Sequence, residues 1–355
     1  MCNGDYVASH YVLFYGFNLF RTSMSEWVTL FTIVLIGWVV AREVISTLIR
    51  VQRSTSVGQQ VYESGPAAHL AKQGTPTMGG IAFPIAAVVA AAYLTAEYHY
   101  DSRLLLMVGL VASVAAIGFV DDYLSIKRRT SLGLRARSKM LLLIIVAAVA
   151  AHGFLDGTAT DCAYSLTTGN DQWWFGRLLY LPISWYYILA IAAVVGCANA
   201  VNLTDGVDGL AGSVALPPLV VLSFLDGGGI GIAVATAVVV FLFYNRYPAK
   251  VFMGDTGSLT LGALLAFLAI KEHLLLFLPL LGIVFVVEAL SVIAQVISFK
   301  LTGKRIFKMS PLHHHFELSG WSEQRVTRTF ALVSLFAAVV FCAIVYYSNV
   351  RMPGT

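Results

Sequence analysis

The chain contains repeated apolar runs that are each long enough to cross a lipid bilayer. Such runs, of about 20 residues, recur from residue 25 to residue 348. Hydrophobic residues make up 58% of the sequence and charged residues only 12%, whereas a soluble domain carries about 25% charged residues. The runs are also unbroken, while the strands of a membrane barrel alternate over about 10 residues. The sequence therefore predicts an all-α integral membrane protein.

The apolar runs predict about ten transmembrane helices within a single polytopic membrane domain, residues 1–355. We place the helices at residues 25–48, 77–96, 104–120, 138–154, 181–201, 209–225, 230–247, 257–275, 277–298 and 327–348. An even number of spans leaves both termini on one side of the membrane. The remaining external parts are an N-terminal segment, 1–24, and a hairpin, 155–180. The first 25 residues lack the basic region and cleavage site of a removable signal peptide.

Basic residues predict the orientation of these helices. Most lysines and arginines fall in loops on one side of the predicted topology, above all in Lys127–Lys139 and Lys300–Arg328. Short loops rich in Lys and Arg stay in the cytoplasm. The predicted orientation therefore puts both termini in the periplasm. The net charge of +4 is small, and no feature of the sequence points to nucleic acid.

Five aspartates gather at the predicted cytoplasmic ends of helices. Asp121 and Asp122 end the third span in GFVDDYLS, Asp205 and Asp208 precede the sixth in NLTDGVDGL, and Asp255 opens the eighth in VFMGDTGSL. A single Asp before a helix is often only an N-cap, and that alternative stays open for Asp205 and Asp255. Capping does not explain the adjacent pair, which lies where the helix dipole disfavours negative charge. Adjacent carboxylates favour a cation, and Mg2+ suits oxygen ligands and phosphate substrates.

Basic and glycine-rich segments accompany the acids on the same side. Lys72 precedes GTPTMGG, whose glycines allow close backbone approach and whose position at a helix start suits an anion. The block Lys127–Lys139 could bind anionic lipid head groups, but its nearness to the acidic pair also favours a role with phosphate. These features predict an anionic ligand, while the absence of a GKS or GKT ending excludes a Walker loop.

Histidines and one deep carboxylate add to the predicted site. Three consecutive histidines, His313 to His315, cannot all point the same way, so this tripeptide alone does not predict a three-ligand zinc site. One or two of them could contact a diphosphate, or they could be ordinary loop residues. Glu288 lies well inside the ninth span, with Gln295 two turns nearer the cytoplasm. An ionisable group at that depth suggests function, and a structural hydrogen bond to a neighbouring helix is an equal alternative.

Together these residues predict a phosphoryl-type transfer at the membrane surface. A metal ion and basic side chains would stabilise charge on phosphate while one carboxylate serves as base. The residues alone do not identify the substrates.

Five motifs, in order, resemble the phospho-N-acetylmuramoyl-pentapeptide-transferase family, within the polyprenyl-phosphate N-acetylhexosamine-1-phosphate transferase superfamily. They are GTPTMGG, GFVDDY, NAVNLTDGVDGL, NRYPAKVFMGDTGS and PLHHHFELSGW, and they extend from about Lys72 to Arg328. The resemblance implies transfer of phospho-MurNAc-pentapeptide from UDP-MurNAc-pentapeptide to undecaprenyl phosphate, giving lipid I and UMP, with Mg2+ as cofactor. It also implies a multi-pass protein of the bacterial cytoplasmic membrane, acting in the first membrane step of peptidoglycan synthesis. A homodimer is suggested by the family but by no residue here.

The resemblance also implies roles for individual residues. Asp121 becomes the expected base on the lipid phosphate, Asp122 supports substrate or metal, and Asp255 becomes the leading Mg2+ ligand, with all three as expected metal ligands. The expected catalytic set is Asp121, Asp122, Asp255 and His314. The expected substrate-binding set is Lys72, Thr77, Lys139, Asn202, Asp205, Gly206, Val207, Asp208, Asn245, Phe252, Gln295, His313 and His315, with Phe252 stacked on uracil. Since no separate nucleophile is evident, we favour direct attack by the lipid phosphate.

Two other functions compete with this hypothesis. One is a sibling transferase that uses UDP-GlcNAc or another UDP-N-acetylhexosamine, and the PLHHHFE segment favours the muramoyl-pentapeptide branch over it. The other is a transporter with a cytoplasmic acidic site. Transporters carry paired ionisable residues near the middle of the bilayer, whereas here only Glu288 is expected to lie deep.

Overall fold

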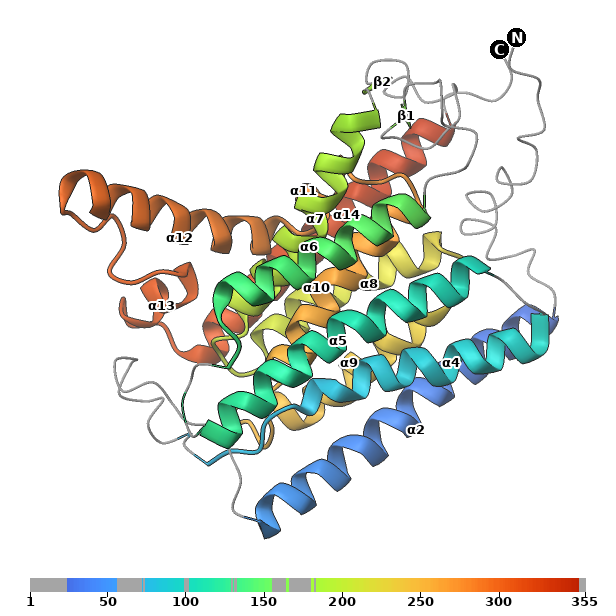
Figure 1. Cartoon of the computed structure of the whole chain (residues 1–355), viewed down its shortest axis with the longest axis horizontal. Coiled ribbons are helices and arrows are strands. Elements are labelled where there is room, and N and C mark those ends of the chain that lie inside the picture. Colours follow the sequence, from blue (N-terminus) through green and yellow to red (C-terminus); the bar gives the residue numbers. More distant parts are fainter. Residues whose placement is uncertain are drawn as a thin grey trace.

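The fold is a bundle of long helices, seen in a computed structural model that describes residues 24–55, 72, 74–98, 102–128, 130, 133–154, 164–165, 180–181 and 183–350 (Figure 1). The helices are α2 Met24–Ser54, η1 Gly79–Ile81, α4 Ala82–Tyr98, α5 Ser102–Arg128, α6 Ala136–Gly153, α7 Ile183–Thr204, α8 Leu210–Leu225, α9 Ile230–Asn245, α10 Gly254–Lys271, α11 Leu278–Leu281, α12 Ile283–Thr302, α13 Leu312–Glu317 and α14 Glu323–Val350. Each of the ten predicted spans overlaps at least one of these helices. The predicted external segment 1–24 lies almost wholly outside the described residues, as does most of the predicted hairpin 155–180.

Seven of the described helices are long and apolar enough to cross a membrane, judged by length and composition. They are α2, η1 with α4, α5, α6, α7, α12 and α14, and the shorter apolar helices α8 and α9 accompany them. Large apolar side chains are exposed on the outer helices, such as Phe31 on α2 and Phe336 on α14, each 68% exposed. Apolar surface of this extent requires an apolar environment. The chain is therefore a multi-pass membrane protein, as the sequence predicted.

Helix α10 forms the centre of the bundle. It packs against α5, α7, α8 and α4, and every residue from Thr256 to Ile270 is buried. A helix that is apolar on all sides is stable only when it is surrounded by others. The consequence for function is that the N-terminus of α10, which carries Asp255, is held at a fixed position by four neighbouring helices.

Two predicted helix boundaries were wrong. The third predicted span ended at residue 120, but α5 continues to Arg128, so the aspartate pair lies inside the helix. The ninth predicted span is divided at Gly282 into α11 and α12. Beyond this break α12 leans away from the bundle, with α13 beneath its outer half (Figure 1). Its outer part is apolar and exposed, as at Leu301, which is 79% exposed.

One short strand pair was absent from the all-α prediction. Strands β1 (Tyr164–Ser165) and β2 (Tyr180–Leu181) pair in antiparallel fashion, with Tyr164 opposite Leu181. The pair lies in and beside the predicted hairpin, and the rest of the described chain outside the loops is helical.

Candidate functional site

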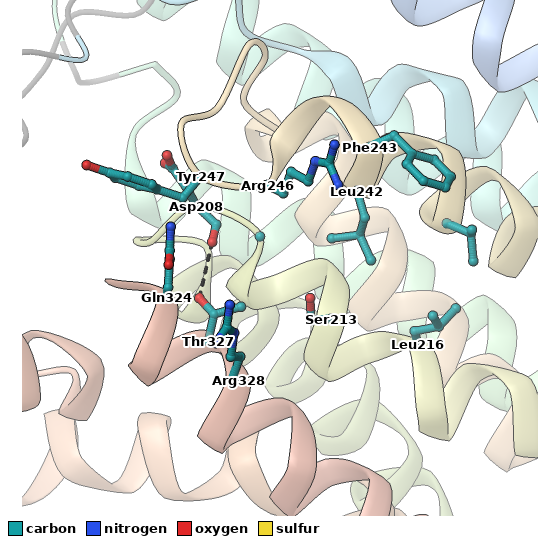
Figure 2. Close-up of a pocket in the computed structure, with 12 residues that line it drawn as sticks. Asp208, Ser213, Leu216, Leu242, Phe243, Arg246, Tyr247, Gln324, Thr327 and Arg328 are labelled. Atoms are coloured by element: carbon teal, nitrogen blue, oxygen red, sulfur yellow. Dashed lines mark hydrogen bonds between the residues drawn. The ribbon is translucent and has the colours of Figure 1, made fainter. Parts of the chain in front are cut away.

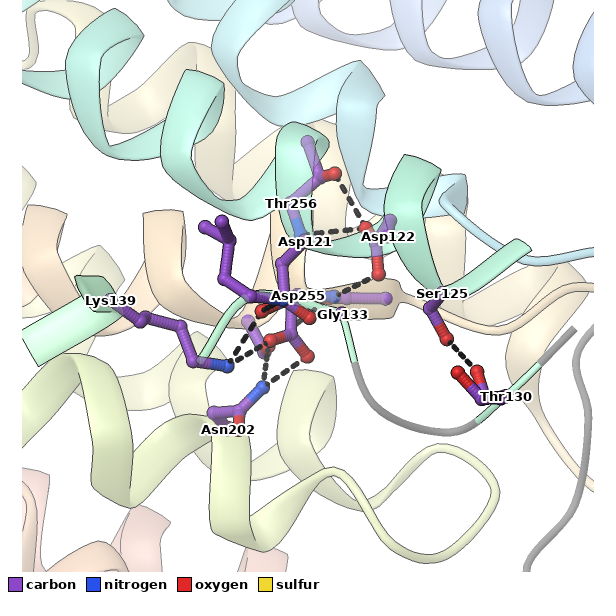
Figure 3. Close-up of polar contacts among 12 residues, drawn as sticks. Asp121, Asp122, Ser125, Thr130, Gly133, Lys139, Asn202, Asp255 and Thr256 are labelled. Atoms are coloured by element: carbon purple, nitrogen blue, oxygen red, sulfur yellow. Dashed lines mark hydrogen bonds and ion pairs between the residues drawn. The ribbon is translucent and has the colours of Figure 1, made fainter. Parts of the chain in front are cut away.

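Asp122 caps the N-terminus of α10 from the neighbouring helix α5. Its carboxylate accepts hydrogen bonds from the backbone N–H groups of Asp255 and Thr256, both at 2.9 Å, and from the Thr256 hydroxyl at 2.6 Å (Figure 3). The first N–H groups of a helix have no partner within the helix, and a carboxylate there is favoured by the helix dipole. Asp122 therefore fixes where α10 begins. The sequence leaves capping open for Asp205 and Asp255 but predicts that it does not explain the adjacent pair; that prediction was wrong for Asp122, which caps a neighbouring helix and not its own.

Asp121 and Asp255 share one lysine. Lys139, in the first turns of α6, lies 2.6 Å from the Asp255 carboxylate and 3.3 Å from that of Asp121. Asn202, near the end of α7, donates from its side-chain amide to Asp255 at 2.7 Å and to Ser258 at 2.9 Å (Figure 3). Four helices thus bring their polar groups to one point. Two carboxylates with a single ammonium group leave negative charge that a further cation would balance.

The closeness of α5 and α10 depends on Gly118. A Cβ at this position would lie 2.5 Å from the Asp255 carbonyl oxygen and 2.6 Å from the Thr256 Cα, which is closer than atoms can approach. Gly118 lies one turn before Asp121 and Asp122 on α5. The absence of its side chain therefore lets the aspartate pair reach the start of α10.

The donor set at this point suits a hard divalent cation. The described residues contain no cluster of three or more His, Cys, Asp or Glu side chains arranged to hold a metal ion. Mg2+ is usually held by one or two carboxylates together with substrate phosphates and water, so two carboxylates are enough. Asp121 and Asp255 fit this description, whereas both oxygens of Asp122 are already engaged by α10.

Lys72 links the GTPTMGG segment to α14 and to the loop between α7 and α8. Its ammonium group lies 2.8 Å from Asp208 and 2.6 Å from Glu323. Burial acts to lower the pKa of Lys72, but the two carboxylates outweigh it, and the pKa lies above its ordinary value. Glu323 could not be predicted as a partner of Lys72 from the sequence, because an acid in the first turn of a helix gives no signal beyond favourable interaction with the helix dipole.

Asp208 and Asn245 hold the loops around this lysine. The second Asp208 oxygen accepts from the Ala249 backbone N–H at 2.9 Å. The Asn245 side chain accepts from the Gly209 N–H at 2.9 Å and donates to the Val251 carbonyl at 2.8 Å. Both residues were predicted to bind substrate, and in the structure both connect the loop before α8 to the loop before α10.

Phe252 is held against the GTPTMGG segment by backbone hydrogen bonds. Its N–H donates to the Pro76 carbonyl and its carbonyl accepts from the Gly79 N–H, both at 2.8 Å. The backbone of Thr77, between them, pairs with the side chain of Gln52 on α2, at 2.8 and 3.0 Å. Phe252 itself is only partly buried.

Asp205 differs from the other four acids. Among the described residues none donates a hydrogen bond to its carboxyl group. Burial and, to a smaller extent, the neighbouring carboxylates raise the pKa of Asp205 to about 7. A carboxyl group with that pKa is protonated for part of the time at neutral pH, and it can then donate a hydrogen bond to a ligand. Val207, two residues on, is buried.

The three histidines point to three different partners. His313 Nδ1 lies 3.1 Å from a Glu288 carboxylate oxygen, and the other oxygen accepts the His313 backbone N–H at 3.1 Å. His314 Nδ1 lies 2.7 Å from Glu317, and His315 Nδ1 accepts from the Lys308 N–H at 3.1 Å. The divergence expected from the tripeptide is confirmed.

The Glu288–His313 pair is buried and joins α12 to α13. Glu288 is 1% exposed and His313 is fully buried. Burial lowers the pKa of His313 against the opposing effect of Glu288, so the ring is neutral at pH 7. This pair realises the structural alternative considered for Glu288. Gln295 is likewise engaged, because its side chain holds the backbone of Ile306 and Phe307 at 3.0 Å.

Comparisons with known proteins cover the site. The family described as glycosyl transferase family 4 matches residues 104–273, and a phospho-N-acetylmuramoyl-pentapeptide-transferase signature matches residues 72–83. A phospho-N-acetylmuramoyl-pentapeptide-transferase of Carboxydothermus hydrogenoformans is 46% identical over 303 residues, 80% of this chain and 89% of that protein. Proteins of that name from Shouchella clausii and Bacillus subtilis are 43% and 42% identical, over 89% of this chain and 97% and 98% of their own lengths. All five acids lie within the first matched range.

Proposed function

We propose that Asp121, Asp122 and Asp255, here called the acidic cluster, form a catalytic centre, because the chain belongs to the phospho-N-acetylmuramoyl-pentapeptide-transferase family. As a member, it transfers phospho-MurNAc-pentapeptide from UDP-MurNAc-pentapeptide to undecaprenyl phosphate. The products are lipid I and UMP, and the reaction is the first membrane step of peptidoglycan synthesis. The single observation that carries the proposed location of the chemistry is that Lys139 and Asn202 both contact Asp255, while Lys139 also pairs with Asp121.

Asp255 and Asp121 are the proposed ligands of Mg2+. Both have carboxylate oxygens that face one cationic group, Lys139, and their combined charge exceeds that of the lysine. When bound, the ion would neutralise negative charge on the diphosphate and on the leaving UMP. We assign Asp122 a supporting role, since its hydrogen bonds to α10 hold Asp255 in position.

Asp121 is the proposed base for the lipid phosphate. Its carboxylate also accepts the Leu134 backbone N–H at 3.0 Å, which keeps it oriented toward Lys139. Loss of the last proton from the lipid phosphate to Asp121 would give the more nucleophilic dianion. That dianion would attack the phosphorus of the sugar phosphate directly and displace UMP, while Lys139 would interact with the charged oxygens.

The proposed nucleotide pocket lies between the α7–α8 loop, Lys72 and Phe252. Phe252 is partly buried and offers an aromatic ring for stacking on uracil, and Asp205 has a carboxyl group without a protein partner among the described residues. Lys72 and the backbone of the Gly206–Asp208 segment would contact the nucleotide, with Thr77, Val207 and Asn245 supporting the loops. His314 and His315 are proposed to face the sugar phosphate, and His313 and Gln295 to hold their segment in place.

We further propose ten spans with both termini in the periplasm and the catalytic centre in the cytoplasm. The positive-inside rule supports this orientation, and the Lys300–Arg328 segment lies on the same side as the acids. The proposal can be tested by fusing a reporter enzyme that is active only in the periplasm to the C-terminus. If a C-terminal reporter that works only in the cytoplasm were active and the periplasmic reporter were not, the proposed orientation would be contradicted.

Activity of the purified protein tests the substrate assignment. Release of UMP should require both UDP-MurNAc-pentapeptide and undecaprenyl phosphate, and it should stop when EDTA removes divalent metal and resume when Mg2+ is added. UDP-GlcNAc in place of the muramoyl substrate should give no product. Turnover of UDP-GlcNAc alone would support the sibling transferase instead, and uptake of solute by the protein in liposomes without UMP release would support a transporter.

A further inference from the structure

A cavity of about 400 Å³ lies between α8, α9 and α14 and extends to Asp208. Its lining combines two kinds of residue. Figure 2 shows Gln324, Thr327 and Arg328 toward one end and Leu216 and Phe243 toward the other, with Arg246 between the two groups. The cavity therefore has a polar end and an apolar end.

Two arginines in the lining give the cavity positive charge. Arg246 follows the last residue of α9, and Arg328 lies in the second turn of α14. Both are exposed, and in the described part of the chain neither forms an ion pair with a carboxylate. Asp208 is the acidic residue in the lining, but it is 5% exposed and is already paired with Lys72. The guanidinium groups thus remain available to an external anion.

The apolar end lies on helices of the membrane bundle. Phe243 is 52% exposed, and Leu216, Val239 and Leu242 continue the apolar wall between α8 and α9. Arg246 and Arg328 lie at the C-terminal end of α9 and the N-terminal end of α14. These helix ends are the ones nearest to the acidic cluster. In a membrane protein these helix ends lie at the level of the lipid head groups, where Arg side chains contact phosphates.

We propose that this cavity binds an anionic membrane phospholipid, with its phosphate between Arg246 and Arg328 and the start of an acyl chain along Leu216 and Phe243. Guanidinium groups bind phosphate oxygens through paired hydrogen bonds. An anionic lipid has a phosphate that can contact the arginines and an acyl chain that can contact the apolar side chains of the lining. Bound lipid would also brace the nucleotide loop, because Thr327, next to Arg328, donates to the Asp208 carbonyl at 3.1 Å.

The experiment compares two double variants with the wild-type protein. Arg246→Gln with Arg328→Gln removes the proposed phosphate contacts. Arg50→Gln with Arg53→Gln is the matched control, because these two arginines are exposed at the end of α2 and form no ion pair within the described residues. Each purified protein is mixed with phosphatidylglycerol or phosphatidylcholine in detergent, and bound lipid is counted by native mass spectrometry while the unfolding temperature is recorded.

We expect the wild-type protein and the α2 control to retain phosphatidylglycerol in preference to phosphatidylcholine and to unfold at a higher temperature in its presence. The cavity variant should bind phosphatidylglycerol at least tenfold more weakly and lose the temperature shift. A variant with lysine at both cavity positions keeps the charge and should bind at an intermediate level. Equal losses in both glutamine variants, or no preference for the anionic lipid, would overturn the proposal.

Two further arms distinguish the source of the phosphate. Inorganic phosphate at millimolar concentration should not reproduce the temperature shift, since it lacks the acyl chain. Undecaprenyl phosphate should not displace phosphatidylglycerol from the cavity. Full protection by inorganic phosphate, or displacement by undecaprenyl phosphate, would contradict a phospholipid site.

Discussion

The buried Glu288–His313 pair should hold α13 against α12, and replacing Glu288 tests this. Its two oxygens accept the backbone N–H and the ring N–H of His313, both at 3.1 Å, at a site where neither residue is more than 1% exposed. Glu288→Leu leaves two buried donors without an acceptor. Each such group costs about 1–3 kcal/mol, so the expected loss of stability is roughly 2–6 kcal/mol. Glu288→Gln keeps an acceptor for the backbone N–H and should cost about half as much.

The assay measures unfolding temperature and UMP release for the two Glu288 variants. We expect Glu288→Leu to unfold at the lowest temperature and Glu288→Gln at an intermediate one. Both should lower kcat/KM, because the histidine segment loses its support. Glu43→Leu on α2 is the control, since Glu43 is exposed and exposed substitutions usually change stability by less than about 0.5 kcal/mol. If Glu288→Leu matched the wild-type protein in both measurements, the pair would not support α13.

Three further predictions concern the loops and the helix cap. Gly206→Ala puts a Cβ 2.4 Å from His313 Nε2 and should reduce the rate of UMP release. Gly196→Ala is the control, because its Cβ would meet nothing within 4 Å, and it should leave the rate unchanged. Equal rates for both variants would argue against contact between the α7–α8 loop and His313. Because the pKa of Asp205 is raised to about 7, the stability that this group contributes is full below about pH 4 and is lost as pH rises through 7. The affinity for UMP without metal, measured by calorimetry, should fall as pH rises through 7, because the ionised Asp205 carboxylate repels phosphate. Asp205→Asn should remove this pH dependence of UMP affinity. An unchanged pH dependence in the variant would contradict the raised pKa of Asp205. Asp122→Ala should cost about 0.5–2 kcal/mol, as for other lost caps, and should lower kcat more than nucleotide affinity; unchanged stability in thermal unfolding would count against the cap.

The helices could be predicted from the sequence because the apolar runs are long and contain few charges. The break at Gly282 was missed, because α11 and α12 are apolar on both sides of it and the apolar run hid the two local signals, Pro279 and Gly282 itself. The end of α5 was placed too early for a related reason. Polar residues after Asp121 suggested that the membrane ended there, but a helix can continue into the aqueous phase.

The sequence predicted which acidic residues belong to the candidate site, but not which contacts each of them makes. Asp121, Asp122 and Asp255 all belong to acidic motifs, yet only the packing of α5 on α10 shows that Asp122 faces the backbone of Thr256. The pairing of Lys72 with Glu323 joins residues 251 positions apart. No local pattern predicts such a contact, because it depends on how α14 returns to the bundle.

The central claim is that Asp255, at the start of α10, is essential for the transfer reaction. The most direct measurement is the rate of UMP release by Asp255→Ala in detergent with saturating substrates and Mg2+. Glu97→Ala is the control, because it removes an exposed acid on α4. Removal of one such electrostatic group usually lowers kcat by about 10²–10³-fold. We predict a loss of at least this size for Asp255→Ala, with normal folding and with full activity in Glu97→Ala. Wild-type activity in Asp255→Ala would contradict the account.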